Sequence, residues 1–368
     1  MTTLGENNQR IEVLDGLRGI AIFAAVIYHY ANNLIDADAS QFNLTLKSLT
    51  QFFYTSIDMF FLLSGFLLGG ILLKNKQSPN FFKTFYMRRV YRIIPLYFLL
   101  LFVVGIICFV GIGSGTDWWF HQELPFWIYF TFLQNIFIGI TNSLGNAWLS
   151  PSWSLGVEEQ FYLIISFLIY FSPKRTLIFI LTAGIIAAPV FRYHAPTVFA
   201  LSTFTYCRFD ALFGGILLAI VYQDAVCVSF IKKHIGKLQI LTLGLFAVSF
   251  LFSVGKWHMA LYLTNSWFTI IYAAVILLVL VDSQNIFHRL ASYQFFVRLG
   301  LYSFSIYLFH EIILGLFFFL IPGKLPQIHS VADALMVALC AILTYFVARF
   351  LYLHLEKRFM ALGHQYNY

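Results

Sequence analysis

The chain has 368 residues, of which 60% are hydrophobic and only 11% are charged. Soluble proteins carry roughly 25% charged residues, so the composition excludes a soluble globular protein and indicates an integral membrane protein surrounded by membrane lipid. The formal net charge of +7 is explained by basic cytoplasmic loops, and we therefore predict no nucleic-acid partner.

Apolar runs long enough to cross a hydrocarbon core of about 30 Å predict an all-α, polytopic membrane bundle of about ten transmembrane helices. The predicted spans are residues 13–34, 50–73, 93–113, 155–171, 176–192, 204–222, 238–255, 265–281, 299–321 and 332–353. A shorter run at 126–140 follows Pro125 and contains Gln134 and Asn135. If it does not cross, the basic loops after it lie on the same side as loop 74–89, as the positive-inside rule requires. We therefore predict a re-entrant or interfacial segment there.

This topology places both termini in the cytoplasm and the protein in the bacterial plasma (inner) membrane. The polar N-terminal segment, MTTLGENNQRIE, lacks the features of a cleavable signal. The outer segment 114–154 is expected to cover the outer mouth of the bundle. We expect residues 1–368 to form one membrane domain with no fused soluble domain.

The first predicted helix contains DGLRGIAIFAAVIYHY, in which Asp15, Arg18 and His29 interrupt an apolar sequence. Arg18 and His29 are eleven residues apart, so on an α-helix they share a face and are separated by about 16 Å. Ionisable groups inside membranes usually face the bundle interior or an aqueous cavity. The helix therefore lines a polar path, unless Asp15 and Arg18 are merely interfacial and a carbonyl satisfies His29. A salt bridge to Arg18 is the simplest role for Asp15.

The cytoplasmic loop 74–92 is basic and contains no acid. Its lysines are explained by topology alone. Arg88, Arg89 and Arg92, however, run directly into the next span before Pro95. A guanidinium fork matches phosphate geometry, so these arginines predict a phosphate-bearing ligand at the cytoplasmic face.

The segment PSWSLGVEEQFYLI opens the fourth predicted span with two adjacent acids, Glu158 and Glu159. Acids near a helix start are favoured by the helix dipole. Adjacent residues point in directions about 100° apart, so the two cannot face the same partner. We expect one of them to lie beside His29 and to fix its tautomer.

Two later spans carry further polar groups. Ser303, Tyr307 and His310 form one stripe in LYSFSIYLFHEII, which favours a lined cavity over a single satisfied histidine. In RFDALFGG, Arg208 and Asp210 each require a partner on another helix, and for Arg208 we predict structural pairing.

The second span carries Asp58, which poses the same problem, and a GxxxG pattern formed by Gly65 and Gly69. This pattern predicts close helix packing rather than ligand binding.

In order along the chain, these motifs resemble those of the membrane acyltransferase-3 family, whose members O-acylate bacterial polysaccharides, lipids and similar acceptors. The resemblance rests on LDGLRGIAIFAAVIYH, FFLLSGFLL, FYMRRVYRIIPLY, WSLGVEEQFYL, RFDALFGG and YSFSIYLFH. It implies transfer of an acyl group, most often acetyl, from cytoplasmic acetyl-CoA or another acyl-CoA to a hydroxyl of a glycan or related acceptor. Some members carry an additional esterase-like domain, which this sequence lacks, so we expect it to act on the acceptor itself or with a partner.

The resemblance also implies roles for the motif residues. Catalytic roles fall to His29, as general base or acyl carrier, and to Arg18, Glu158 and Glu159. Donor binding falls to Arg88, Arg89 and Arg92, and we expect Asp15 to contribute to it. The expected acceptor cavity is lined by His310, Tyr307, Ser303, Asp210 and Trp153.

Two alternatives remain open: a polytopic transporter or channel with an intramembrane charge relay, and a membrane-bound acyltransferase that uses a lipid donor. No inverted repeat supports a transporter. The four cysteines are scattered without a CxxC pair, so no metal is predicted.

Overall fold

The structure is a computed structural model that describes residues 12–110, 124–254, 261–321 and 326–368. Nearly all of the N-terminal segment and the first part of the predicted outer segment, up to residue 123, lie outside these ranges. Within the described residues the chain is helical, and its one bridge between extended residues joins Ile35 and Ile328.

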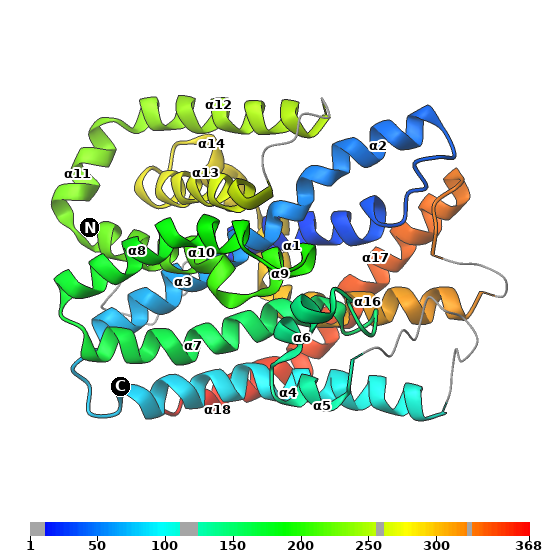
Figure 1. Ribbon diagram of the computed structural model, residues 1–368, viewed down its shortest axis with the longest axis horizontal. Helices are drawn as coiled ribbons and strands as arrows, with labels where there is room; N and C mark the ends of the chain where they lie inside the picture. Colours follow the sequence, from blue (N-terminus) through cyan, green and yellow to red (C-terminus); the bar gives the residue numbers. More distant parts are fainter. Residues whose placement is uncertain (1–11, 111–123, 255–260, 322–325) are drawn as a thin grey trace.

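The long helices form a bundle in which α4 and α12 lie at opposite edges (Figure 1). The helices are α1 (Glu12–Ile27), α2 (Gln41–Gln51), α3 (Ser56–Lys74), α4 (Phe81–Val110), α5 (Trp127–Phe130), α6 (Gln134–Thr141), α7 (Trp153–Phe171), α8 (Lys174–Tyr193), α9 (Val198–Thr203), α10 (Phe209–Gln223), α11 (Ala225–Lys233), α12 (Ile235–Val254), α13 (Leu261–Val281), α14 (Ile286–Ala291), α15 (Gln294–Leu301), α16 (Ser303–Phe319), α17 (Val331–Leu351) and α18 (Lys357–Gly363). Turns of π-helix continue α1 over Tyr28–Asn32 and α17 over Tyr352–Glu356.

The described residues contain nine helical stretches long and apolar enough to cross a membrane, and ten if α15 and α16 count as one broken span. The predicted all-α polytopic bundle of about ten spans is therefore confirmed. The run 126–140 forms α5, of four residues, and α6, of eight residues. Neither is long enough to span a bilayer, which agrees with a segment that does not cross.

Two predicted spans differ from the structure. Helix α4 begins at Phe81 rather than at residue 93, so the arginine-rich segment is helical and not a loop. Pro95 lies inside α4 without ending it, as neighbouring helices often allow in membrane proteins. The predicted span 299–321 is bent by 74° between α15 and α16.

Glycines let α3 and α10 approach within contact distance of their backbones. A Cβ added at Gly65 would lie 2.1 Å from the carbonyl oxygen of Leu212, and one at Gly215 would lie 2.2 Å from that of Leu62. Atoms cannot approach so closely, so a side chain at either position would force the two helices apart. The interpretation of the glycine pattern as a packing motif is confirmed at Gly65.

Replacing Gly65 with alanine is therefore expected to destabilise the fold by about 1–3 kcal/mol, because overpacking forces the backbones apart. Thermal unfolding of the purified protein in detergent measures the loss. Gly70→Ala is the matched control, since its added Cβ would meet the nearest heavy atoms at 3.9 Å. Equal stability of the two variants would contradict the packing argument.

Candidate active site

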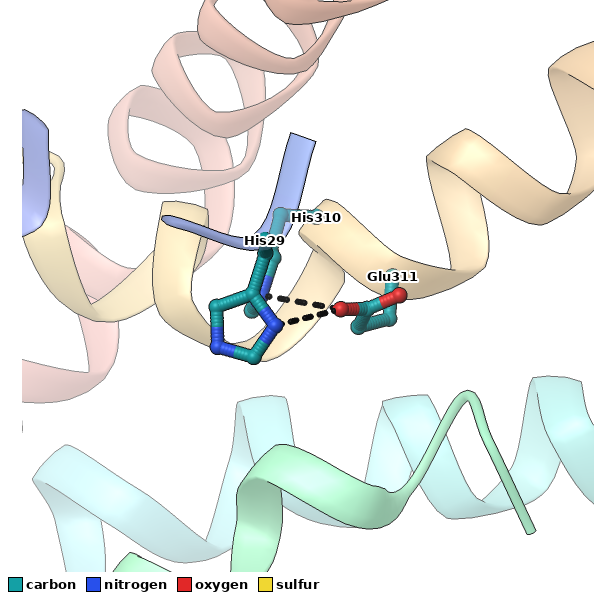
Figure 2. A group of neighbouring side chains, drawn as sticks. All are labelled: His29, His310 and Glu311. Atoms are coloured by element: carbon teal, nitrogen blue, oxygen red, sulfur yellow. Dashed lines mark ion pairs between the residues drawn. The ribbon is translucent and has the colours of Figure 1, made fainter. Parts of the chain in front are cut away.

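His29 lies in the π-helical turn that extends α1 and is paired with a glutamate of α16. Its Nδ1 atom lies 2.8 Å from Oε1 of Glu311 (Figure 2). A carboxylate can only accept, so Nδ1 carries the hydrogen and Nε2 keeps its lone pair. The expectation that Glu158 or Glu159 pairs with His29 was wrong, because the carboxylate at this position comes from Glu311.

His310 joins this pair from the same helix as Glu311. The two histidine ring centroids are 4.8 Å apart, and Nε2 of His310 lies 3.7 Å from Oε1 of Glu311. The Nδ1 atom of His310 lies 2.8 Å from the carbonyl oxygen of Tyr307, so it must donate. The Tyr30 hydroxyl donates to the His310 carbonyl oxygen at 2.6 Å, which fixes the backbone of α16 at this point.

A cavity of about 100 Å³, here called the arginine pocket, lies between α1, α3, α4, α7 and α16. Three arginines line it: Arg18, Arg89 and Arg92. Its other polar lining residues are Ser64, Ser154, Glu158, Tyr162, Ser303 and Tyr307. The pocket therefore offers several cationic groups and hydroxyls to an anionic ligand.

Arg88 does not line the arginine pocket. Its Nε atom donates to the carbonyl oxygen of Tyr366 at 3.0 Å, and its guanidinium lies 5.3 Å from the centre of the Tyr368 ring. Adjacent residues on a helix point about 100° apart, whereas Arg89 and Arg92 share a face. His364 follows directly after α18. Burial lowers its pKa most, and the positive charges of Arg88 and Arg92 lower it further.

Asp15 and Arg18 form the predicted salt bridge, with Oδ1 of Asp15 3.2 Å from Nη1 of Arg18. Asp15 is buried, whereas Arg18 is partly exposed and lines the pocket. The carboxylate therefore orients Arg18, and the ligand-facing group of the pair is the guanidinium.

The two adjacent acids of α7 have different surroundings. Glu158 lines the arginine pocket and accepts a hydrogen bond from the Tyr162 hydroxyl at 2.6 Å. Glu159 is not among the lining residues, and its buried Oε1 has no hydrogen-bond partner in the described part of the chain. As expected from their angular separation, only one of the two enters the cavity. It is Glu158, and it lies with the arginines.

The polar stripe on α16 connects the arginine pocket with His29. Ser303 and Tyr307 line the pocket, and His310 follows Tyr307 by one turn. The Tyr307 hydroxyl donates to the carbonyl oxygen of Pro151 at 2.7 Å. Trp153 is not a lining residue and packs against Phe61 with ring centroids 6.1 Å apart.

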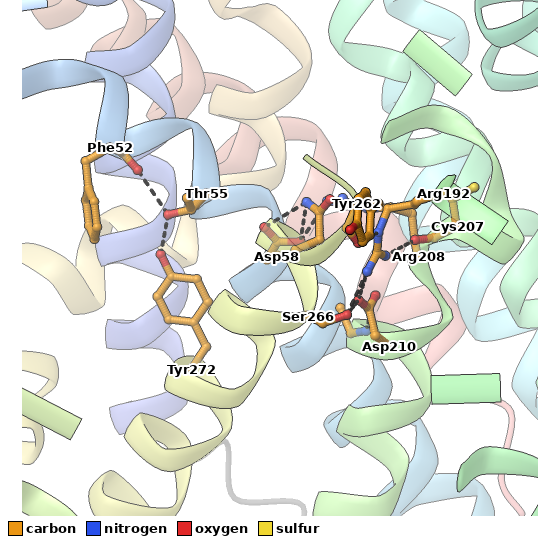
Figure 3. Close-up of polar contacts among 12 residues, drawn as sticks. Phe52, Thr55, Asp58, Arg192, Cys207, Arg208, Asp210, Tyr262, Ser266 and Tyr272 are labelled. Atoms are coloured by element: carbon orange, nitrogen blue, oxygen red, sulfur yellow. Dashed lines mark hydrogen bonds and ion pairs between the residues drawn. The ribbon is translucent and has the colours of Figure 1, made fainter. Parts of the chain in front are cut away.

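Two buried ion pairs hold other intramembrane charges away from this pocket (Figure 3). Arg208 Nη2 lies 2.8 Å from Oδ1 of Asp58, which confirms the structural pairing predicted for Arg208. Nη2 of Arg192 lies 2.8 Å from Oδ2 of Asp210. Asp210, expected at the acceptor cavity, instead joins α8 to α10, because Arg192 provides the partner that its charge requires.

Sequence reasoning missed Glu311, Tyr162 and Arg192. Glu311 follows His310 directly inside an apolar span, and an acid at such a position is itself a signal. Arg192 is the last residue of the predicted span 176–192, and its side chain is buried in the bundle.

Comparison with known proteins adds independent findings. A family model described as an acyltransferase domain matches residues 11–353. The chain is 26% identical over 363 residues to the O-acetyltransferase OatA of Staphylococcus aureus strain NCTC 8325 / PS 47, an alignment that covers 90% of this chain and 55% of the relative. A putative O-acetyltransferase of S. aureus strain COL is 24% identical over 371 residues, with the same coverage. The chain thus spans about half the length of these relatives. No solved structure matches it.

Proposed function

Because the chain belongs to the acyltransferase domain family, we propose that it transfers an acetyl group from acetyl-CoA to a hydroxyl of a cell-surface glycan or a related acceptor. The relatives named above are O-acetyltransferases, which supports acetyl as the group and oxygen as its destination. In this proposal the protein lies in the bacterial plasma membrane with both termini in the cytoplasm, and the donor enters from that side.

The observation that carries the proposal is that the same helices carry two chemically different groups. The arginine pocket lies at one end, and the pair of His29 and Glu311 lies at the other. Arg18, in the arginine pocket, lies on α1, and His29 lies in the π-helical turn that continues it. Eleven residues of regular α-helix would separate the two by about 16 Å. The planar guanidinium group of arginine can donate two parallel hydrogen bonds to a phosphate, such as those of coenzyme A. The flexible pantetheine arm of the donor is long enough to bring the thioester from the pocket to His29.

At the other end, the pair of His29 and Glu311 suits proton transfer. With Nδ1–H donated to Glu311, Nε2 is free to accept the proton of the acceptor hydroxyl. The hydroxyl oxygen then forms a bond to the thioester carbonyl carbon, the carbon–sulfur bond breaks, and the thiolate takes up a proton. The same nitrogen could instead carry the acyl group transiently before the acceptor arrives.

Donor binding tests the arginine pocket. Arg89→Gln and Arg92→Gln should each weaken acetyl-CoA binding by about tenfold or more, because a hydrogen bond to a charged group contributes about 1.5–3 kcal/mol. Binding of acetyl-CoA to the purified protein is measured by calorimetry. Arg88→Gln is the control, since its side chain faces Tyr366 and Tyr368. Unchanged affinity in the Arg89 and Arg92 variants would remove the phosphate-binding role.

Glu311→Gln tests the histidine pair. The amide keeps the shape of the side chain but cannot stabilise the imidazolium formed during proton transfer, so the rate should fall by about 10²-fold or more. Acetyl-CoA affinity, measured on the same preparation, should stay at the wild-type value. A variant with wild-type turnover would show that Glu311 does not assist His29.

A further inference from the structure

The residues in Figure 2 form a cluster whose chemistry extends beyond proton transfer. We propose that His29, His310 and Glu311 constitute a binding site for a divalent transition-metal ion of the zinc class. The ligand atoms of the three side chains all lie within 4.8 Å of one another. Two imidazoles with one carboxylate form a donor set typical of zinc sites.

The distances are close to those that a metal requires. Two ligands bound tetrahedrally at about 2.0–2.1 Å from zinc lie about 3.3 Å apart. Glu311 Oε1 lies 2.8 Å from Nδ1 of His29 and 3.7 Å from Nε2 of His310. All three atoms lie within 4.8 Å of one another, so coordination requires the side chains to rotate until the atoms approach this tetrahedral spacing.

His310 supplies the independent observation that points to a ligand. It is 3% exposed, and its Nε2 has no hydrogen-bond partner among the described residues. With Nδ1 donating to the Tyr307 carbonyl, Nε2 of the neutral imidazole carries a lone pair, and that lone pair lies beside the Glu311 carboxylate. The lone pair and the carboxylate repel each other, and a cation bound between them would remove that repulsion. A histidine that binds a metal usually donates its other ring N–H to a carboxylate, a backbone carbonyl or water, as His310 does here.

Metal binding excludes the arrangement used for proton transfer. The ion coordinates Nδ1 of His29, so the ring hydrogen moves from Nδ1 to Nε2, and Nε2 can no longer accept a proton. The hydrogen bond to Glu311 is then lost. If His29 acts as proposed above, the metal-loaded protein is the inactive state.

Zinc binding to the chelator-treated, full-length protein in detergent tests the site. Zn²⁺ is titrated in competition with a chromogenic chelator, without donor or acceptor, so the result does not depend on the proposed activity. The wild type should bind one Zn²⁺ per chain. His310→Gln and Glu311→Gln should each bind it at least tenfold more weakly, and excess Mg²⁺ should not displace it.

His329→Ala is the matched control, because His329 faces Asp36 at 3.4 Å in an exposed pair and its loss should leave the stoichiometry at one. Co²⁺ provides a second measurement that needs no variant, since histidine coordination gives it visible absorption. Absence of saturable Zn²⁺ binding, or wild-type affinity in both site variants, would overturn the proposal. A protein that binds Zn²⁺ but transfers no acyl group even after the metal has been removed with a chelator would refute the proposed function and leave the metal site intact.

Discussion

Replacing His29 with glutamine is expected to lower the rate of acyl transfer by about 10²–10⁴-fold, the range that a positioned general base contributes. Glutamine retains a hydrogen-bonding side chain, but it has no nitrogen that can accept a proton from the acceptor hydroxyl. The measurement is the amount of base-labile acetyl on surface glycans of cells that contain equal membrane levels of wild type and variant.

The control for this experiment is His354→Gln. His354 is an exposed histidine near the end of α17 that stacks on Phe350, so its replacement should leave acetylation unchanged. Acetylation retained in the His29 variant at the wild-type level would rule out both the base and the acyl-carrier role.

Replacing Asp58 with asparagine is expected to lower the free energy of unfolding by about 3–5 kcal/mol, since it leaves a buried arginine without its counter-charge. Arg208 is 1% exposed, and its Nε and Nη1 atoms have no hydrogen-bond partner within the described ranges. The carboxylate of Asp58 also accepts from the Asn265 amide at 3.3 Å. Denaturant or thermal unfolding in detergent measures the loss.

A double-mutant cycle provides the control. Asp58→Asn combined with Arg208→Gln removes both charges, so the pair should lose less stability than the sum of the two single variants. Additive losses, or a stable Asp58→Asn protein, would show that the pair does not hold α3 against the start of α10.

The spans could be predicted because hydrocarbon imposes a length and a composition on each helix, and charge asymmetry identifies the segment that fails to cross. The start of α4 could not, because arginines at its beginning have the same hydropathy in a loop and in a helix. The bend between α15 and α16 was equally hidden, since it depends on packing against other helices.

For the site, periodicity was sufficient where both residues lie on one helix. The bridge of Asp15 to Arg18 and the stripe of Ser303, Tyr307 and His310 follow from helical geometry. Partners across helices did not follow. Glu311 was missed because which helix faces His29 depends on tertiary packing and on the π-helical turn, neither of which periodicity reveals.

In the proposed mechanism, one end of the site binds the donor and the other end performs the transfer. The most direct test measures acetyl-CoA affinity and acyl-transfer rate together for wild type, Arg92→Gln and His29→Gln. Arg92→Gln should weaken acetyl-CoA affinity, with a transfer rate that recovers at saturating donor. His29→Gln should keep its acetyl-CoA affinity and lose its transfer rate at every donor concentration. Loss of acetyl-CoA affinity in the His29 variant together with wild-type affinity in the Arg92 variant would contradict this division between donor binding and transfer.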